Sequence, residues 1–155
     1  MQIPVQVPAG GGERLWVVED LTTILLDSAQ TGGLFSLFEI EVSPGKGVPP
    51  HSHSREDETF ILLEGQLTFW IDGKTTKAGP GDVLHAPKNV PHQFTNQTDA
   101  DARLYVIATP GGFENFFRMI GDPADEPGGP APAPDMDRMM AGFEAFGLTL
   151  LPPPE

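Results

Sequence analysis

GKGVPPHSHSREDETFILLEG, residues Gly45–Gly65, contains three potential metal ligands close together: His51, His53 and Glu58. Side chains two positions apart on a strand point to the same face, so the two histidines can converge on one ion. Glu58 has the opposite parity and would point away along a continuous strand. The polar run 54–57 predicts a turn that resets this parity before a new strand begins. The three ligands then meet inside a folded sheet.

Short apolar runs separated by turn residues extend on both sides of this stretch. In residues 34–42, Phe38 and its alternate neighbours share one face, which is typical of a half-buried strand. Asp72-Gly73 is a strong hairpin signal. His92, a fourth candidate ligand, opens another short strand about forty positions after the first cluster. Strands of this kind close most easily into a sandwich or a small barrel, so we predict an all-β fold.

The composition narrows the classes of function. Acidic residues outnumber basic ones by 22 to 9, for a formal charge of −13, and such a surface repels nucleic acids and anionic membranes. The chain contains no cysteine, so histidine and carboxylate are the ligands to consider. No basic region followed by a long apolar run starts the sequence, and no stretch approaches the length of a membrane span. We expect a cytoplasmic protein without nucleic-acid or membrane partners.

The chain is expected to form an N-terminal arm (1–14), a β-barrel (15–110) and a C-terminal helical extension (111–155). Alternating Ile3, Val5 and Val7 leave open an additional edge strand in the arm. Within the extension, residues 121–134 are too rich in proline and glycine for a packed element and predict a loop.

Two short helices are predicted in the C-terminal extension. The first carries Phe113, Phe116, Phe117 and Ile120 at helical spacing and ends at Gly121. Asp135 is expected to cap the second helix, which runs to about Phe146. That helix is predicted to pack on the outer sheet or on a partner chain, through a face made of Met136, Met139, Met140 and Phe143.

Neutral imidazoles and one carboxylate suit a divalent transition metal. Fe, Mn, Ni, Co, Cu or Zn fits this donor set, whereas Ca and Mg prefer oxygen ligands. Glu56 is an alternative carboxylate, although Glu58 opens the apolar run and has the parity of Phe60 and Leu62. His85 lies outside the ligand spacing and is expected to be structural, with a local hydrogen bond.

These residues resemble the two signature motifs of the cupin superfamily. In the first motif a glycine, His-x-His, a glutamate and a second glycine recur at set spacings. The matching positions are Gly45, His51, His53, Glu58 and Gly65, and the second motif is matched at Gly81, Pro87, His92 and Asn96. Asn89 stands where the family usually has glycine. Asparagine tolerates a left-handed backbone better than other non-glycine residues, so that turn should survive.

The resemblance implies a fold and a metal site. Cupins are jelly-roll β-barrels, also described as a double-stranded β-helix, and here short C-terminal helices would follow the barrel. The residues matching His51, His53, Glu58 and His92 bind the metal in that family. The chain is most similar to small single-domain bacterial cupins related to quercetin 2,3-dioxygenase. The narrower resemblance implies dioxygenation of a small aromatic or enolisable substrate.

Several roles remain open within this resemblance. Glu58 is the candidate to move a proton in catalysis, as the matching residue is thought to do in quercetinase-like cupins. A substrate pocket is predicted from six apolar side chains, for which core packing or a docked helix is the alternative explanation: Phe38, Phe60, Leu62, Phe94, Phe113 and Phe117. The reaction could instead be an isomerisation or cyclisation with the metal as Lewis acid. A non-catalytic module that binds a metal or a small molecule is the third possibility.

A homodimer is also predicted. The strand that runs from Glu58 to Leu63 is apolar on both faces, so its outer face needs a covering partner.

Overall fold

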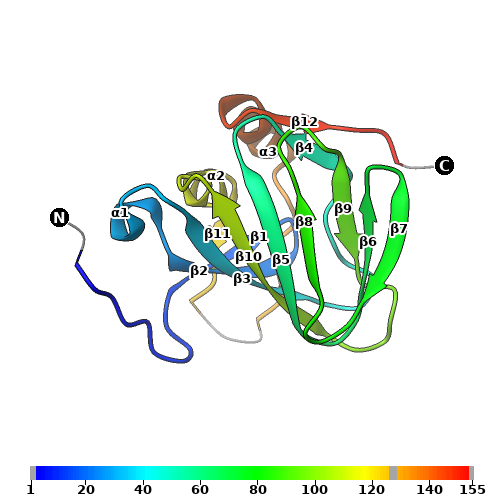
Figure 1. Ribbon diagram of the computed structural model, residues 1–155, viewed down its shortest axis with the longest axis horizontal. Helices are drawn as coiled ribbons and strands as arrows, with labels where there is room; N and C mark the ends of the chain where they lie inside the picture. The colour runs from blue at the N-terminus through cyan, green and yellow to red at the C-terminus, as the bar shows by residue number, and fades with distance from the viewer. Residues whose placement is uncertain (1–2, 126–128, 154–155) are drawn as a thin grey trace.

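The computed structural model describes residues 3–125 and 129–153, and within them two antiparallel sheets pack face to face (Figure 1). One sheet has seven strands in the spatial order β11-β1-β2-β3-β10-β5-β8, and the other has five in the order β12-β4-β9-β6-β7. The seven strands are β1 Glu13–Val17, β2 Asp20–Leu26, β3 Ser36–Val42, β5 Asp57–Glu64, β8 Val83–Ala86, β10 Ala102–Thr109 and β11 Asp122–Pro123. The five strands are β4 His51–His53, β6 Leu67–Ile71, β7 Lys74–Ala78, β9 His92–Thr95 and β12 Leu148–Leu150.

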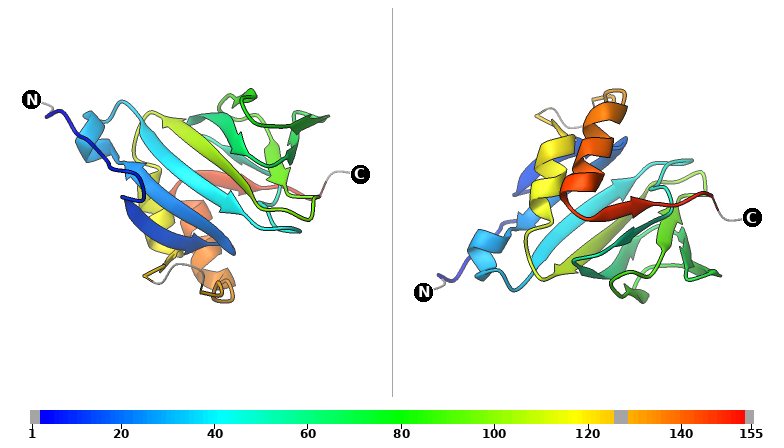
Figure 2. Two further views of the ribbon diagram at one scale, coloured as in Figure 1. Left: turned by 90° about the horizontal axis from the view of Figure 1, so that it is seen from below. Right: turned by 90° about the horizontal axis from the view of Figure 1, so that it is seen from above.

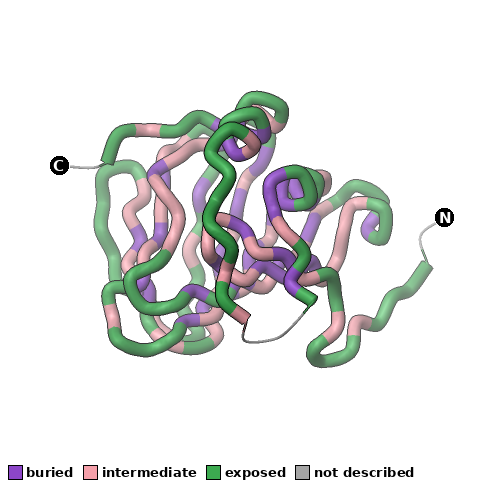
Figure 3. The backbone as a smooth tube through the Cα atoms, turned by 180° about the vertical axis from the view of Figure 1, so that it is seen from behind, coloured by how far each residue is buried: buried purple, intermediate pink, exposed green. Residues whose placement is uncertain are grey.

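The core lies between the two sheets, and the burial pattern alternates along the long strands (Figure 3). In β3, Phe38, Ile40 and Val42 face inward and are buried, whereas Glu39 and Glu41 face outward. This pattern follows from the two-residue repeat of a strand that has one face covered. The predicted all-β jelly-roll fold is confirmed.

Two of the predicted turns have the left-handed backbone that their residues favour. Asp72 (φ 49°) and Gly73 (φ 83°) join β6 to β7, as expected for a tight hairpin. Asn89 has φ 64°, so the asparagine adopts the conformation usually supplied by glycine at this position. Its amide nitrogen donates a hydrogen bond to the carbonyl of His53 at 2.7 Å, which links this turn to the first ligand strand.

The two predicted C-terminal helices are present as α2 (Glu114–Ile120) and α3 (Met136–Ala145), and they lie side by side against the β1 end of the seven-stranded sheet (Figure 2). The Asp135 side chain accepts a hydrogen bond from the amide of Arg138, so the predicted cap is confirmed.

The predicted buried face of α3 is wrong in part. Met139 and Phe143 are buried, but Met136 and Met140 are exposed. Gly142 lies so close to Ile120 that a Cβ at this position would be 2.5 Å from Ile120 Cγ2. Because Gly142 has no side chain, α3 can pack on α2. Packing on the outer sheet, one of the two predicted alternatives, is therefore wrong.

Four local features differ from the sequence-based expectations. Residues 121–134 are expected to form a loop, but Asp122 and Pro123 form β11 and pair with β1, while 126–128 lie outside the described residues. A four-residue helix, α1 (Ser28–Thr31), forms between β2 and β3, where no helix is predicted, with Asp27 as its cap. The C-terminal extension, expected to be helical, also contributes a strand, β12, which pairs with β4. Residues 3–9 form no strand and Ile3 is 77% exposed, so the possible edge strand in the arm is absent from the part of the arm that the structure describes.

Candidate metal centre and pocket

The first three candidate ligands come from two different sheets. His51 and His53 lie on β4 of the five-stranded sheet, and the chain then crosses to the seven-stranded sheet, where Glu58 is the second residue of β5. The polar residues 54–56 belong to neither strand. This crossing turns Glu58 toward the histidines, and the predicted change of parity is confirmed.

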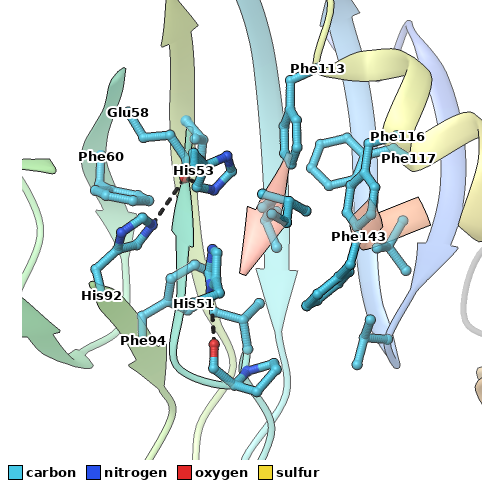
Figure 4. A pocket seen from close by; sticks show the side chains of 17 residues that line it. His51, His53, Glu58, Phe60, His92, Phe94, Phe113, Phe116, Phe117 and Phe143 are labelled. Atoms are coloured by element: carbon cyan, nitrogen blue, oxygen red, sulfur yellow. Dashed lines mark hydrogen bonds and ion pairs between the residues drawn. The ribbon is translucent and has the colours of Figure 1, made fainter. Parts of the chain in front are cut away.

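His92, the first residue of β9, completes the group. Its backbone is paired with that of His51, because β9 lies next to β4. One ligand atom from each of His51, His53, Glu58 and His92 can be chosen so that all four lie within 4.8 Å of one another. In Figure 4 the imidazoles of His53 and His92 approach the Glu58 carboxylate, and Oε1 of Glu58 is 2.5 Å from Nε2 of His53 and 3.0 Å from Nε2 of His92.

Each of the three imidazoles has an acceptor near Nδ1, which leaves Nε2 directed toward the centre of the group. This outer support is what orients histidine ligands in metal sites. The acceptors are the Pro49 carbonyl for His51 (2.8 Å), the Val90 carbonyl for His92 (3.1 Å) and Oε1 of Glu56 for His53 (3.4 Å). Glu56 thus lies behind His53 and outside the group of four converging residues, whereas Glu58 belongs to that group.

The electrostatics of the group reflect burial and close opposite charges. Burial, followed by the neighbouring imidazoles, lowers the pKa of His51 to about 3. Burial also acts to lower the pKa of His53, but the Glu58 and Glu56 carboxylates outweigh it and raise that pKa to about 9. For Glu58, burial acts to raise the pKa, and the imidazoles of His53 and His92 hold it well below its usual range. The carboxylate is therefore ionised, as a ligand must be.

The donor set fits a divalent transition metal. Nε2 of His53 is buried and makes no regular hydrogen bond among the described residues, and its one close polar neighbour there is Oε1 of Glu58 at 2.5 Å. Orphaned buried polar atoms are rare in native proteins and indicate a missing partner. A cation at the point where the four donors converge would satisfy His53, and a His₃Glu set suits the transition metals named above.

The four residues line one side of a pocket whose other walls are apolar (Figure 4). Of the substrate-binding residues predicted from the sequence, Phe60, Phe94, Phe113 and Phe117 lie in its wall. The prediction is wrong for Phe38 and Leu62, which are buried in the core outside the lining. The ring centroid of Phe38 is 4.7 Å from that of Phe117, so Phe38 packs behind the wall.

Sequence reasoning missed part of the pocket wall. Phe116 and Phe143 face the pocket from α2 and α3, and the ring of Phe116 lies with its centroid 5.0 Å from that of Phe113. Helical spacing placed these phenylalanines on apolar faces but could not show which cavity they reach. Further aliphatic lining residues had no signal beyond strand alternation: Val17, Val18, Ile40, Val48, Val106 and Leu148.

A buried carboxylate holds the start of α2 in place. Glu114 is 1% exposed and accepts hydrogen bonds from the Ser28 amide (2.8 Å), the Ser28 hydroxyl, the Ser36 hydroxyl (2.5 Å) and the Gly112 amide (3.0 Å). Burial acts to raise its pKa, but these donors outweigh the effect and lower the pKa to about 2. Glu114 therefore ties α2, with its phenylalanines, to β3 and α1.

His85 lies outside the site. It is exposed on β8, and its Nδ1 atom is 2.9 Å from the Thr59 hydroxyl on the neighbouring strand. The prediction of a local structural contact is confirmed.

When the chain is compared with known protein families, residues 38–108 match the family model described as the cupin domain. This match is consistent with the fold and with the cluster of four potential ligands. Residues 38–108 form a cupin domain. This range contains the four clustered residues and most of both sheets.

Two proteins similar to this chain are named quercetin 2,3-dioxygenase. A quercetin 2,3-dioxygenase of Bacillus subtilis is 33% identical over 153 residues, which is 97% of this chain and 45% of that protein. A second quercetin 2,3-dioxygenase, from Aspergillus japonicus, is 33% identical over 89 residues, 54% of this chain and 25% of the fungal protein. The chain thus spans less than half the length of these two relatives.

Similar structures include a predicted oxalate decarboxylase of Thermotoga maritima, with a TM-score of 0.63 and 19% identity over 68% of this chain and 99% of the other. A sugar phosphate isomerase of the cupin superfamily from Silicibacter pomeroyi has a TM-score of 0.59 and 25% identity over 68% of this chain and 75% of the other. These likenesses support the fold. Among the described residues, no helix is both long enough and apolar enough to cross a membrane.

Proposed function

We propose that the chain binds one divalent transition metal per molecule through His51, His53, Glu58 and His92. We further propose that it is a dioxygenase for a small aromatic or enolisable substrate. The observation that carries this proposal is the placement of the four donors in the wall of an otherwise apolar pocket rich in phenylalanine. The likeness to proteins named quercetin 2,3-dioxygenase supports the same reaction.

The apolar wall favours an uncharged ring over a small anion. Within the described part of the chain, no lysine or arginine lines the pocket, so a carboxylate or phosphate substrate would lack a cationic partner there. Phe60, Phe94 and Phe113 offer faces and edges against which a planar ring can pack, and they exclude water from the site. The pocket walls therefore orient the substrate, and the four donors define which end of it reacts.

Glu58 is the proposed proton acceptor. A bound divalent metal would lower the pKa of a coordinating hydroxyl and provide a position for dioxygen. The Glu58 carboxylate is ionised and faces the pocket next to His53 and His92, so it can accept the proton that such a hydroxyl releases.

Oxygen uptake by metal-loaded protein tests the proposal. With a panel of flavonols and 1,3-diketones we expect consumption of dioxygen together with one of the substrates. Glu58→Gln should lower the rate by about 10²- to 10⁴-fold, whereas His85→Ala should leave it unchanged. Substrate loss without oxygen uptake would indicate the metal-dependent isomerase or cyclase instead. Tight binding without turnover would indicate a non-catalytic module, and failure to bind any transition metal would refute the metal site.

We also propose that the chain forms a homodimer through the outer face of the seven-stranded sheet. Ile61 and Leu63 of β5 are partly exposed on this face, and Val83 of the neighbouring β8 is 62% exposed. Burying this apolar surface against a second copy would stabilise the pair. Light scattering at micromolar concentration should give twice the 16.7 kDa chain mass, and a mass near one chain would contradict the proposal.

A further inference from the structure

One side of the pocket is less well covered than the rest. Of the 17 lining residues, all are buried except four, which are partly exposed: Val18, Val48, Pro49 and His51. Val18 lies in the β1–β2 turn (17–20), and Val48 and Pro49 lie in the segment 45–50 between β3 and β4. The partly exposed side therefore runs between these two segments, which we call the entrance of the pocket.

The pocket is too small for an aromatic ligand as it stands. Its volume is about 70 Å³, which is room for a few water molecules. An engineered protein cavity that takes up benzene has a volume of about 150 Å³. A wall must move before a ring can enter, and the partly exposed side is where the least packing has to be broken.

Segment 45–50 forms the fixed side of the entrance, because its backbone is hydrogen-bonded to β9 and to Asn96, the residue that follows β9. Gly47 approaches β9 so closely that a Cβ would be 2.3 Å from the Phe94 carbonyl oxygen. The backbone hydrogen bonds are Gly45 N to Asn96 O (2.9 Å), Val48 N to Phe94 O (3.0 Å) and Asn96 N to Lys46 O (2.8 Å).

The β1–β2 turn, in contrast, is held in an unfavourable conformation. Val18 (φ 48°) and Glu19 (φ 72°) both adopt left-handed backbone, which is rare for a β-branched residue such as valine. The next residue, Asp20, is 2% exposed, and neither oxygen of its carboxyl group has a hydrogen-bond partner among the described residues. Opening the turn would relieve the backbone strain and expose this carboxyl group to water, so the turn is the side that moves.

We propose that the β1–β2 turn is a gate over the pocket and that the ion pair between Lys46 and Glu19 is the latch that holds it against the fixed segment 45–50. Nζ of Lys46 lies 2.9 Å from Oε2 of Glu19, and this pair joins the two sides of the entrance. The side chains are 43% and 41% exposed, so the attraction is weak enough to break and re-form easily. The gate rests on the proposed function only in taking this pocket as the ligand site.

Chemical modification of the histidines tests the gate without metal or substrate. The chain has four histidines, so diethylpyrocarbonate labelling of the metal-free protein, followed by peptide mass spectrometry, reports on His51, His53 and His92 in the pocket, with exposed His85 as internal reference. Lys46→Ala or Glu19→Gln should accelerate labelling of His51 by about two- to fivefold relative to His85, the effect expected when an exposed ion pair is lost. Lys77→Ala, on β7 at the edge of the other sheet, should change nothing.

Two further measurements separate a latch from a general loosening. The double variant Lys46→Ala/Glu19→Gln should label no faster than either single variant, because both remove the same pair. Since the chain has no cysteine, Glu19→Cys/Lys46→Cys can also be joined by a short bis-maleimide, which should slow labelling of His51 below the wild-type rate.

Equal rates at His51 in the wild type, the single variants and the cross-linked protein would overturn the gate. That result would not contradict the dioxygenase proposal, which the oxygen-uptake experiment tests. Conversely, a lack of oxygen uptake would not contradict the gate, which the labelling experiment tests. The two proposals therefore fail separately.

Discussion

Replacing Asp20 by asparagine should make the protein more stable at neutral pH. Asp20 is buried and has no hydrogen-bond partner in the described part of the chain. Burial, followed by the charge of Glu19, raises its pKa to about 8 from 3.8, although Lys46 acts in the opposite direction. Because the native state binds this proton more tightly than the unfolded chain, the stability contributed by the neutral carboxyl is fully present below about pH 4. It is lost progressively as the pH rises to about 8.

The size of the effect follows from the same two pKa values. Between them each pH unit costs about 1.4 kcal/mol of unfolding free energy, so the cost at pH 7 relative to pH 4 is about 4 kcal/mol. Asparagine has the same shape and no charge, and it therefore avoids this cost. The two proteins should have similar stability near pH 4, and Asp20→Asn should gain up to about 4 kcal/mol over the wild type by pH 7.

Urea unfolding of metal-free protein at a series of pH values between 4.5 and 8 measures this difference. Taking the difference between the variant and the wild type removes the contributions of His53 and of other titrating groups that do not interact with Asp20. Asp101→Asn, at an exposed position, serves as the control and should run parallel to the wild type. If the curve of Asp20→Asn also runs parallel to that of the wild type, the carboxyl does not titrate in this window and the reasoning is refuted.

Three further substitutions test the supports of the site and of the helices. Glu56→Ala removes the acceptor behind His53 and should weaken Co²⁺ binding by about 10- to 100-fold in calorimetry, while the exposed control Glu64→Ala should have no effect. Asp135→Ala removes the cap of α3 and should lower the unfolding free energy by about 1 kcal/mol in urea titrations. Glu114→Ala leaves several buried donors unpaired and should cost about 3 kcal/mol by the same measurement, whereas a loss below about 1 kcal/mol would contradict its anchoring role.

The parts of the structure that depend on local patterns could be predicted from the sequence. The positions of His51, His53 and Glu58 relative to a turn were enough to predict their convergence, because strand parity is a local rule. The left-handed backbone of Asn89 and the cap at Asp135 likewise depend on residue type and immediate context.

The remaining features depend on contacts between distant parts of the chain. β12 is three residues long, and its partner β4 lies almost a hundred positions earlier, so nothing in its own composition distinguishes it from a tail. On α3, methionines at helical spacing are compatible with more than one buried face, and the close approach of Gly142 to α2 decides which is used. The burial of Asp20 has no signal in the sequence, because an acidic residue between two apolar runs is typical of an exposed turn.

The pairing of β12 with β4 has a mechanical consequence. Leu148 and Leu150 of β12 lie opposite the two histidines of β4, and the amide of Ser54 donates a further hydrogen bond to the carbonyl of Gly147 at 3.0 Å. A pulling force applied to the chain beyond residue 150 is therefore transmitted to the strand that carries His51 and His53 before it reaches the other strands of the five-stranded sheet. A protein fused at this end through a short, stiff linker would load the ligand strand directly, and a long flexible linker would relieve it.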